Sequence, residues 1–575
     1  MKNAEIAAAF GQLADILEIK GADAFRVNAY RRVSRILEGL GVDAADLVES
    51  GELRSIPGIG EGSASRIEEF LETGEMSDLA EERASIPKGL LELLAVPGLG
   101  PKTVGLLWTE LDVKSLSRLK RALRGKKILE LPGMGKKKVE NLRAGVVAYE
   151  SRTGRLHLGA ALPIARTIVD VLADMGEARE IELAGSLRRY RETIGDVDIL
   201  VSSSRPGPII RAFTELPQVE EVLAAGSTKA SVRVSGAVQV DLRVVEPRSW
   251  GAALVYFTGS KDHNVRLRGL AQDKGMKLNE YALTRGKRTV ASRSEEAVYS
   301  KLGLQFIPPE LREDRGEVEA ALDDRLPQLV EISDMKGDLH VHSNWSDGHA
   351  SIEEMVRAAK RRGYRYISIN DHTRSLGVAN GLTPERLEAQ MEEIDAVNAR
   401  VKNFTVLKGT EVDILSDGSL DMPDDLLERL DVVVASIHSG FSQSIDRITG
   451  RIISAIANPN VDIIGHPTGR LIGSRQAYAV DLEQVMRAAA EHGTALEINA
   501  YPERLDLNAV NVRRAAELGV TIAISTDSHR PEELEWMDVG VRTARRGWLT
   551  KKDVLNARPL RSLRSALRSS PVGLD

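Results

Sequence analysis

Apolar segments alternate with amphipathic stretches along the second half of the chain. Stretches with helical periodicity, such as 351–363 and 482–493, lie between the apolar segments. This strand–helix alternation occurs about seven times and predicts a βα barrel. The apolar segments, each of which ends in a polar group, lie at 337–342, 366–373, 406–414, 431–439, 461–469, 495–507 and 520–529.

The first half of the chain has a different pattern. Residues 1–20 have the periodicity of an amphipathic helix, whereas 238–245 alternates between apolar and polar residues as a strand does. The segment 195–201 is also typical of a strand. A charged stretch at 313–337 is typical of a linker that contains a helix. The two halves therefore predict different folds.

Composition narrows the possible chemistry. The 575 residues suggest about three to four domains, and 42% hydrophobic with 28% charged residues is ordinary for a soluble protein. The chain has no cysteine, so any metal must be bound by His, Asp or Glu. No apolar run reaches the ~18 residues that suggest a membrane span, and the N-terminal helix is not a signal peptide. We therefore expect a cytoplasmic protein.

One glycine-rich pattern occurs three times, at 56–67, 96–107 and 131–142. Each copy has the order apolar-Pro-Gly-apolar-Gly and then continues as an amphipathic helix, so it presents backbone N–H groups at a helix start, where anions bind. A single copy is compatible with an ordinary turn, but three copies resemble helix-hairpin-helix motifs, which bind the DNA backbone without reading sequence. The DNA-binding candidates are Gly58, Gly60, Gly98, Gly100, Gly133, Gly135, Lys136 and Lys137.

Local charge supports this interpretation, although the net charge of -6 does not. Residues 101–150 contain 12 Lys/Arg against 5 Asp/Glu. A charge run is usually a solvated helix face, but this one coincides with the third repeat and favours phosphate binding. The basic residues include Lys126, Lys127 and Lys138 beside the two lysines named above.

Three carboxylates fall on the predicted strands of the first half. Asp196 and Asp198 share one face of the first strand, and Asp241 lies on the second. Three carboxylates on adjacent strands can bind two hard divalent cations, although D-x-D alone is also compatible with a solvated strand cap. Upstream, Gly185-Ser186 and the arginines Arg188 and Arg189 supply donors for phosphate.

Histidines are concentrated in the second half. Three of the ten lie within 337–349. His340 and His342 are two apart, so on a strand both imidazoles face one way, with Asp347 close behind. This segment alone is equally compatible with a metal site and with a strand end that carries two exposed histidines. Other candidates at or near the ends of later apolar segments are His372, His438, His466, Asp527 and His529.

The first half resembles the family X DNA polymerases, through 28–37, 249–271 and 307–313 in addition to the carboxylate segment. The resemblance implies a helical domain at 1–80, fingers at 81–150, a nucleotidyltransferase palm at 151–247 and a thumb at 248–316. It implies that Asp196, Asp198 and Asp241 are catalytic and bind two Mg²⁺ or Mn²⁺, with Asp241 helping to take the proton from the primer 3′-hydroxyl. The implied nucleotide-binding residues are Gly185, Ser186, Arg189, Tyr256, Phe257, Gly259, Asn264 and Arg268.

After a linker at 317–335, residues 336–575 resemble the PHP domain, named for polymerases and histidinol phosphatases. The resemblance implies a distorted (βα)7 barrel with a centre of up to three metals, Mn²⁺ being favoured over Zn²⁺ or Fe²⁺. The fold class is thus multidomain, α+β followed by α/β. All nine ligands of the family match: His340, His342, Asp347, His372, Glu411, His438, His466, Asp527 and His529.

Four residues raise further expectations. Arg66 stands where lyase-active relatives have a Schiff-base lysine, and a guanidinium is a poor nucleophile, so we expect no efficient lyase activity by that route. Tyr190 departs from the family pattern, and we expect its bulk to slow or reshape nucleotide binding. Arg470 would clamp a phosphate or be an exposed arginine, and Asp371 would support His372.

The leading hypothesis is a bacterial repair enzyme that fills short DNA gaps. Its PHP domain would act as a metal-dependent 3′–5′ exonuclease, with AP-endonuclease or 3′-phosphodiesterase activity in addition. The alternatives are a small-molecule phosphoesterase with a vestigial N-terminal half, and a DNA-end-binding scaffold with weak polymerase activity. We expect gapped or primed DNA and deoxynucleoside triphosphates as partners, no membrane contact, a nucleoid location and a monomer.

Overall fold

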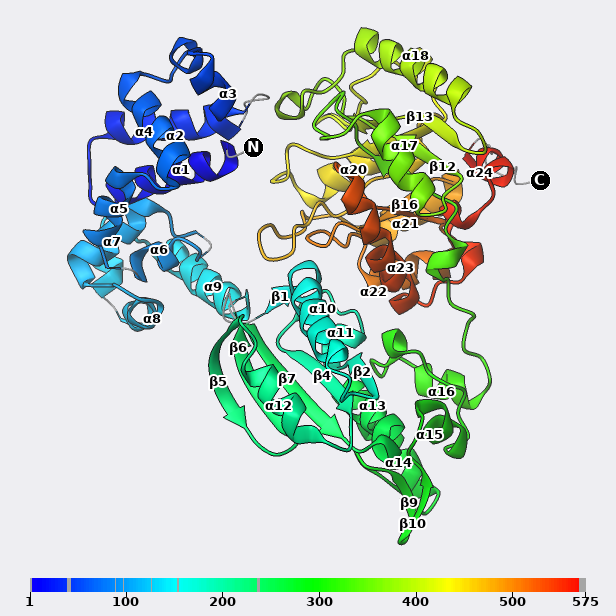
Figure 1. Ribbon diagram of the computed structural model, residues 1–575. Coiled ribbons are helices and arrows are strands. Elements are labelled where there is room, and N and C mark those ends of the chain that lie inside the picture. The colour runs from blue at the N-terminus through cyan, green and yellow to red at the C-terminus, as the bar shows by residue number, and fades with distance from the viewer. Residues whose placement is uncertain are drawn as a thin grey trace. The chain divides into compact units, whose positions relative to one another are not determined.

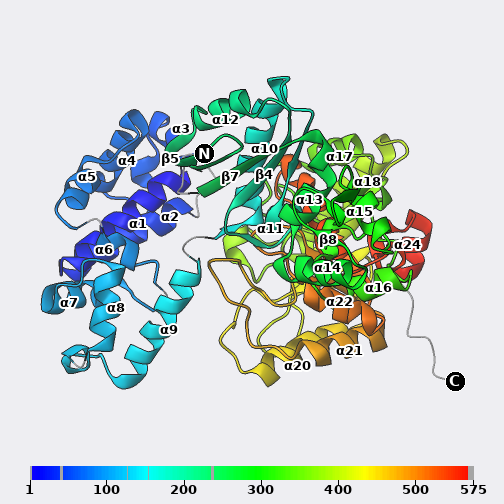
Figure 2. The ribbon, with the colours of Figure 1, turned by 90° about the horizontal axis from the view of Figure 1, so that it is seen from below.

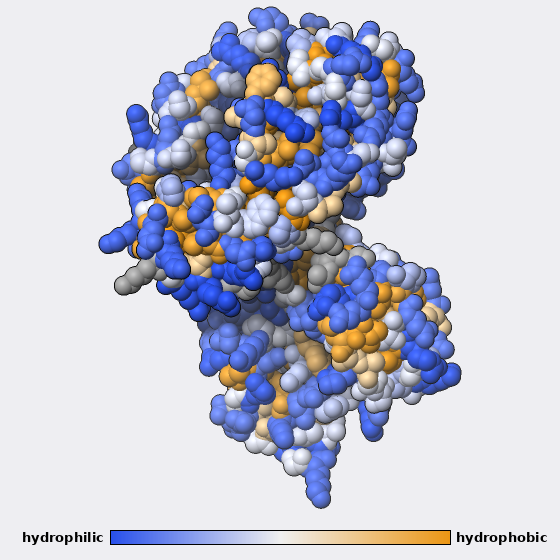
Figure 3. Space-filling view, turned by 90° about the vertical axis from the view of Figure 1, so that its left-hand side faces the viewer, coloured by the Kyte–Doolittle hydropathy of each residue, from blue (hydrophilic) through white to orange (hydrophobic). Residues whose placement is uncertain are grey.

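The computed structural model describes residues 3–38, 43–87, 89–96, 98–125, 127–152, 155–234 and 238–567. It divides into two compact units, Met1–Gly154 and Arg155–Asp575 (Figure 1). No helix within the described residues is long and apolar enough to span a membrane. On the face seen in Figure 3, hydrophilic side chains cover most of the surface and hydrophobic ones form separate patches.

The first unit is helical and has one hydrophobic core. In its first helix Ile6, Phe10, Leu13 and Leu17 recur every three or four residues and are buried, which explains the amphipathic pattern of residues 1–20. The helices are α1 (Asn3–Ile19), α2 (Ala24–Glu38), α3 (Ala44–Glu49), α4 (Glu61–Thr73), α5 (Ser77–Ala84), α6 (Gly89–Leu93), α7 (Pro101–Leu111), α8 (Leu116–Arg124) and α9 (Lys136–Arg152).

The second unit begins with a five-stranded sheet in the order β2-β4-β7-β6-β5. Alternate residues of the central strands, such as Val197, Ile199 and Val240, face helices α10 and α12 in one core. The elements are β1 (Leu156–His157), α10 (Leu158–Asp174), β2 (Glu180–Leu183), α11 (Gly185–Arg188), β3 (Thr193–Ile194), β4 (Val197–Ser202), α12 (Pro206–Thr214), β5 (Val219–Ala225), β6 (Lys229–Val234) and β7 (Val238–Val245).

A smaller helical region follows this sheet and has a core of its own. It begins with α13 (Trp250–Thr258) and α14 (Lys261–Asp273). A three-stranded antiparallel sheet is formed by β8 (Lys277–Leu278), β9 (Leu283–Arg285) and β10 (Arg288–Ala291). The region continues with α15 (Glu295–Lys301), the 3-10 turn η4 (Pro309–Leu311) and α16 (Glu317–Leu322).

Seven parallel strands form the C-terminal region in sequential order, β11 to β17. The barrel is nearly closed, because Val341 and Ser528 form a parallel bridge and the Ser528 carbonyl accepts from the His342 amide at 2.9 Å. The strands are β11 (Gly337–Val341), β12 (Tyr366–Ile369), β13 (Thr405–Asp413), β14 (Val432–Ser436), β15 (Ile463–Ile464), β16 (Ala495–Asn499) and β17 (Ile522–Ser525).

The helices between these strands cover the outside of the barrel, and α20 and α21 lie side by side (Figure 2). They are α17 (Ile352–Arg361), α18 (Pro384–Arg400), α19 (Asp424–Leu427), α20 (Ile445–Ile456), α21 (Leu482–His492) and α22 (Ala509–Glu517). Two further helices, α23 (Met537–Arg546) and α24 (Leu560–Leu567), follow the last strand. Leu563 of α24 packs in a separate core with strand residues such as Leu339 and Tyr366. The predicted fold class, helical region and seven-stranded βα barrel included, is confirmed.

The barrel packs directly against the preceding regions of the second unit. Leu505 and Val539 come from the barrel segment, yet both are buried in the core of the five-stranded sheet. Glu310 in η4 accepts hydrogen bonds from Arg542 Nη1 at 2.5 Å and Arg545 Nε at 2.8 Å, both from α23. Apolar burial and a buried ion-pair cluster therefore join these regions.

Glu310→Ala is expected to cost about 3 kcal/mol of stability, because Arg545 and Arg542 lose the buried carboxylate that they share. They keep only the more exposed Glu331 and Asp538 as partners. The matched control is Glu319→Ala, whose ion pair with Arg266 is about half exposed and is worth about 0.5 kcal/mol. Thermal unfolding of the full chain compares the two. Equal loss in both variants would contradict the buried cluster as a source of stability.

Candidate active sites

The first candidate site is formed by the register of two strands. β4 and β7 pair in parallel with Asp198 directly opposite Asp241. Both side chains point to the face opposite α10 and α12, because their neighbours along each strand fill the core on the other face. Asp196 immediately precedes β4, and ligand oxygens of all three aspartates lie within 4.8 Å of one another. The structure thus brings the three predicted carboxylates together.

Burial and mutual repulsion perturb this cluster. Burial raises the pKa of Asp198 to about 7, with further contributions from Asp196 and Asp241. Asp241 is oriented by Gln239, whose Nε2 donates to Oδ2 at 3.0 Å, and by the Ser231 hydroxyl. Three carboxylates that repel one another at this distance fit a site for divalent cations.

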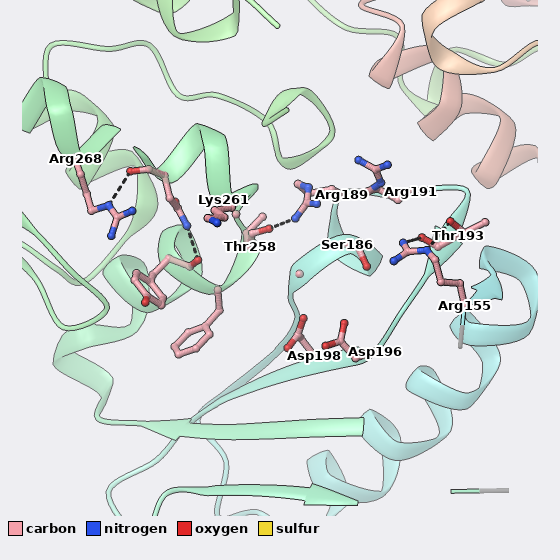
Figure 4. A pocket seen from close by; sticks show the side chains of 15 residues that line it. Arg155, Ser186, Arg189, Arg191, Thr193, Asp196, Asp198, Thr258, Lys261 and Arg268 are labelled. Atoms are coloured by element: carbon pink, nitrogen blue, oxygen red, sulfur yellow. Dashed lines mark hydrogen bonds between the residues drawn. The ribbon is translucent and has the colours of Figure 1, made fainter. Parts of the chain in front are cut away.

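Gly185 allows the helix α11 to start directly beside the aspartate cluster. A Cβ at this position would lie 1.9 Å from Asp198 Oδ2, and φ is +56°. The short helix α11 can therefore start against the carboxylates only with glycine there. The pocket above the carboxylates has a volume of about 590 Å³, and its lining includes Ser186 and Arg189 (Figure 4).

The remaining predicted nucleotide-binding residues lie on the other side of the same pocket. Tyr256 and Phe257 pack edge to face, with ring centroids 5.1 Å apart. Asn264 Nδ2 donates to the Tyr256 carbonyl at 2.7 Å, which ties α14 to the end of α13. Gly259 and Arg268 complete this side of the lining.

Three pocket cations were not predicted as site residues: Arg155, Arg191 and Lys261. Figure 4 shows Arg155 beside Thr193, to whose carbonyl it donates at 2.6 Å. Arg188, by contrast, does not line the pocket. Its two terminal nitrogens are bound by the Glu295 carboxylate at 2.9 and 2.7 Å, so the expectation that it offers donors to phosphate is wrong.

The glycine-rich repeats share one structure. The apolar residue between the glycines, Ile59, Leu99 or Met134, is buried in the core. The glycines on either side are exposed, and the second one directly precedes α4, α7 or α9. The first glycine of each pair, Gly58, Gly98 or Gly133, has a positive φ. Three helix starts therefore carry exposed backbone.

Charged residues around the repeats are placed as follows. Lys136 and Lys137 are exposed at the start of α9, and Lys138 donates to the Thr103 hydroxyl at 3.2 Å. Lys126 lies outside the described residues. Arg66 on α4 forms an ion pair with Asp78, with Nε donating at 2.8 Å.

The second candidate site lies at the carboxyl ends of the barrel strands. Each of its residues follows from strand geometry, since the ends of parallel strands meet at one rim. His340 and Glu411 belong to β11 and β13 themselves, and the others come directly after a strand or in the loop that follows it. The latter are His342, Asp347, His372, His438, His466, Asp527 and His529.

Glu411 is the centre of this cluster. Its Oε2 lies 2.8 Å from His372 Nδ1, and its Oε1 lies 3.0 Å from His466 Nε2. His340 and His438 approach within 3.4 and 3.3 Å. Burial would raise the pKa of Glu411, but the neighbouring histidines, His372, His438 and His340, hold it well below its usual range. Asp527 lies 3.0 Å from His342, and Asp347 lies within 3.5 Å of His372 and His529. The nine predicted ligands thus form one connected cluster.

Several buried atoms of this cluster have no hydrogen-bond partner. They include His340 Nε2, both ring nitrogens of His342, and Glu411 Oε2. Buried polar atoms without partners are costly in a folded protein, and here they converge within metal-ligand distance. Imidazole and carboxylate donors in this arrangement fit divalent transition metals.

A further group of carboxylates orients the histidines. Glu497 on β16 binds His340 Nδ1 at 2.8 Å and the His466 amide at 2.7 Å, and Asp413 binds His438 Nδ1 at 2.7 Å. Such partners fix the ring nitrogen that faces a metal. Sequence reasoning missed both, because neither stands beside a histidine in the chain.

Two expectations about this site are wrong. Asp371 accepts hydrogen bonds from the amide and hydroxyl of Ser343, and it anchors the loop that carries Asp347 rather than supporting His372. Arg470 is bound by Glu192 of the five-stranded-sheet region at 2.9 and 3.0 Å, so it neither clamps a phosphate nor lies exposed.

Arg504 is the arginine that lies near the cluster. Its Nε is 3.5 Å from Asp527 Oδ2, and its buried Nη1 has no hydrogen-bond partner. It therefore offers positive charge beside the carboxylate ligands, where the sequence had suggested Arg470.

Models of known protein families match four separate segments of the chain. The chain matches family models described as a helix-hairpin-helix domain at 1–76, a SAM-like helix-hairpin-helix tandem at 90–146, a DNA polymerase beta thumb at 253–313 and a PHP domain at 338–501. The fold and both sites thus define an enzyme with a polymerase region and a PHP domain.

Relatives define the family more closely. The chain is 43% identical to the DNA polymerase/3′-5′ exonuclease PolX of Bacillus subtilis strain 168, over 97% of both chains. It is 34% identical to a probable phosphatase of Thermoanaerobacter sp. strain X514, over 38% of this chain and 89% of that protein. The chain therefore belongs to the bacterial family X DNA polymerases that carry a C-terminal PHP domain.

Metal binding at the aspartate cluster should depend on pH. Since the pKa of Asp198 is raised to about 7, protons compete with a cation below that pH. We expect the affinity for Mn²⁺ to fall roughly fivefold between pH 7 and 6. This affinity is measured by titrating the full chain with Mn²⁺. The binding curve of the Asp198→Asn variant is subtracted to remove the contribution of the PHP site. A difference that stays constant from pH 8 to 6 would count against the raised pKa.

Proposed function

We propose that the protein is a repair polymerase that fills short gaps in DNA and trims 3′ ends with its PHP domain. The observation that carries this proposal is the pair of separate carboxylate-containing clusters, Asp196–Asp198–Asp241 and the nine residues that include Glu411. The chain that carries them belongs to the family that includes the DNA polymerase/3′-5′ exonuclease of B. subtilis. We propose action as a monomer on DNA in the bacterial cytoplasm.

In the polymerase site the three aspartates would bind two Mg²⁺ or Mn²⁺. These ions would lower the pKa of the primer hydroxyl and neutralise the leaving pyrophosphate. Asp241 accepts the proton as the 3′-oxygen bonds to the α-phosphorus and the bond to pyrophosphate breaks. Ser186 and Arg189 bind the triphosphate, and the pocket cations Arg155, Arg191 and Lys261 add charge that attracts it.

The sugar and base of the incoming nucleotide would lie on the opposite side. Tyr256 and Phe257, which line the pocket, would contact the sugar and select deoxyribose, and Asn264 and Arg268 on α14 would lie along the nascent pair. The hairpins would bind the DNA backbone on both sides of the gap through exposed helix starts and lysines such as Lys136 and Lys137.

In the PHP site the nine ligands would bind up to three divalent metals, with Mn²⁺ favoured. These metals would supply a hydroxide and neutralise phosphate oxygens during hydrolysis of the terminal phosphodiester. Glu497 and Asp413 hold the histidines in position, and Arg504 is placed to bind the phosphate. Hydrolysis at abasic sites would use the same centre.

A DNA-end-binding scaffold with weak polymerase activity is the second candidate. The observation that favours it is that two arginines of the pocket form ion pairs with Glu313. The Glu313 carboxylate accepts hydrogen bonds from Arg189 Nε and Arg191 Nη1 at 3.1 Å each. Partial neutralisation of the pocket would weaken nucleotide binding. The intact aspartate cluster favours the polymerase.

The test uses a 5′-labelled primer on a one-nucleotide gap with Mn²⁺, with and without nucleotides. Extension with nucleotides and 3′ shortening without them support the proposal. Asp198→Ala should abolish extension, by a factor of at least about 10³, and spare shortening. His340→Ala should do the reverse, because the two clusters share no residue.

Loss of both activities in either variant would contradict two independent sites. Shortening without any extension by the native chain would favour the scaffold. A DNA complex without turnover in Mg²⁺ and Mn²⁺ would exclude both catalytic proposals.

A further inference from the structure

Tyr190, the residue that departs from the family pattern, does not face the nucleotide pocket. Its φ is +51°, a left-handed conformation that is rare for aromatic residues. The ring lies against α23 of the PHP domain, with the Arg542 guanidinium 5.0 Å from its centroid and the hydroxyl 3.5 Å from Asp538 Oδ2. Its bulk therefore lies outside the pocket, in an interdomain contact, and an effect on nucleotide binding stays a prediction.

The whole segment around Tyr190 is held by the PHP domain. On one side of it, Arg546 Nη1 from the end of α23 donates to the Arg189 carbonyl. On the other side, Glu192 accepts two hydrogen bonds from Arg470. The chain between α11 and β3, which carries the pocket arginines, thus depends on PHP side chains for its backbone position.

A single carboxylate, that of Glu313, links Arg189 of the pocket to Arg546 of α23. Glu313 Oε1 accepts from Arg189 Nε and from Arg546 Nη1, both at 3.1 Å. The side chains of Glu313 and Arg546 are only 8% exposed, so water screens this cluster weakly. Arg189 and Arg191 line the nucleotide pocket, whereas Arg546 does not.

The charge balance gives Arg546 a role. Alone with Glu313, the two pocket arginines would share its negative charge and attract a triphosphate less strongly. A third arginine compensates that charge and fixes the backbone of one of them. We propose that Arg546 is a positioning residue for nucleotide addition, through which the PHP domain holds Arg189 and Arg191 ready for the triphosphate. This inference rests on the proposed polymerase function.

The test compares Arg546→Met and Arg546→Lys with the native full-length chain on gapped DNA. For Arg546→Met we expect the KM for each deoxynucleoside triphosphate to rise about tenfold, with kcat within about threefold. Arg546→Lys keeps the charge and should give an intermediate KM. The affinity for gapped DNA and the rate of 3′ shortening should stay within about twofold of native, because the partners of Arg546 are Arg189 and Glu313, which belong neither to the hairpins nor to the PHP ligands.

Arg513→Ala is the matched control. Arg513 also joins the PHP domain to the region before it, by donating to the Arg315 carbonyl at 3.0 Å and stacking on Trp548, but it has no link to the pocket. It should leave the KM native. An equal rise in Arg513→Ala, an unchanged KM in Arg546→Met, or a fall in kcat alone would overturn the positioning role. If the native chain does not extend primers at all, the proposed function fails instead.

Discussion

Both candidate active sites depend on parallel strand pairing. Where two strands pair in parallel, residues far apart in sequence lie side by side, and their side chains come within ligand distance. In the polymerase region a single pair of this kind, β4 and β7, places Asp198 opposite Asp241. In the PHP domain seven strands repeat the arrangement and gather residues from 340 to 529. A register shift of one residue in β7 would turn Asp241 into the core.

The sequence alone predicted the fold class and candidate site residues that lie together in the structure. These residues are recognisable because each belongs to a short local sequence pattern. The glycine pairs, the D-x-D segment and the histidines at strand ends are each recognised within a few residues. The missed residues have partners far along the chain. Glu497 lies 157 residues from His340, and its segment has the pattern of an ordinary buried strand. Arg188 and Arg189 are adjacent, and only Glu295, 107 residues away, separates their roles.

Tyr190 and Arg470 show the same limit in a different way. Each was expected to act in the active site nearest to it in sequence, and each contacts the other catalytic region instead. Sequence spacing says which residues share a loop, but it does not say which surface covers that loop. Here the covering surface is α23 and the segment before it, and buried charges such as Glu310 and Glu313 hold it.

The position of Leu505 and Val539 has a consequence for how the chain can be divided. Both belong to the C-terminal barrel segment, yet they complete the hydrophobic core of the five-stranded sheet. A cut in the stretch between the two catalytic regions would leave an apolar face of the polymerase region open to water, a surface of the kind that promotes aggregation. The two catalytic regions are therefore more than tethered, because the unit of folding extends across the boundary between their two chemistries.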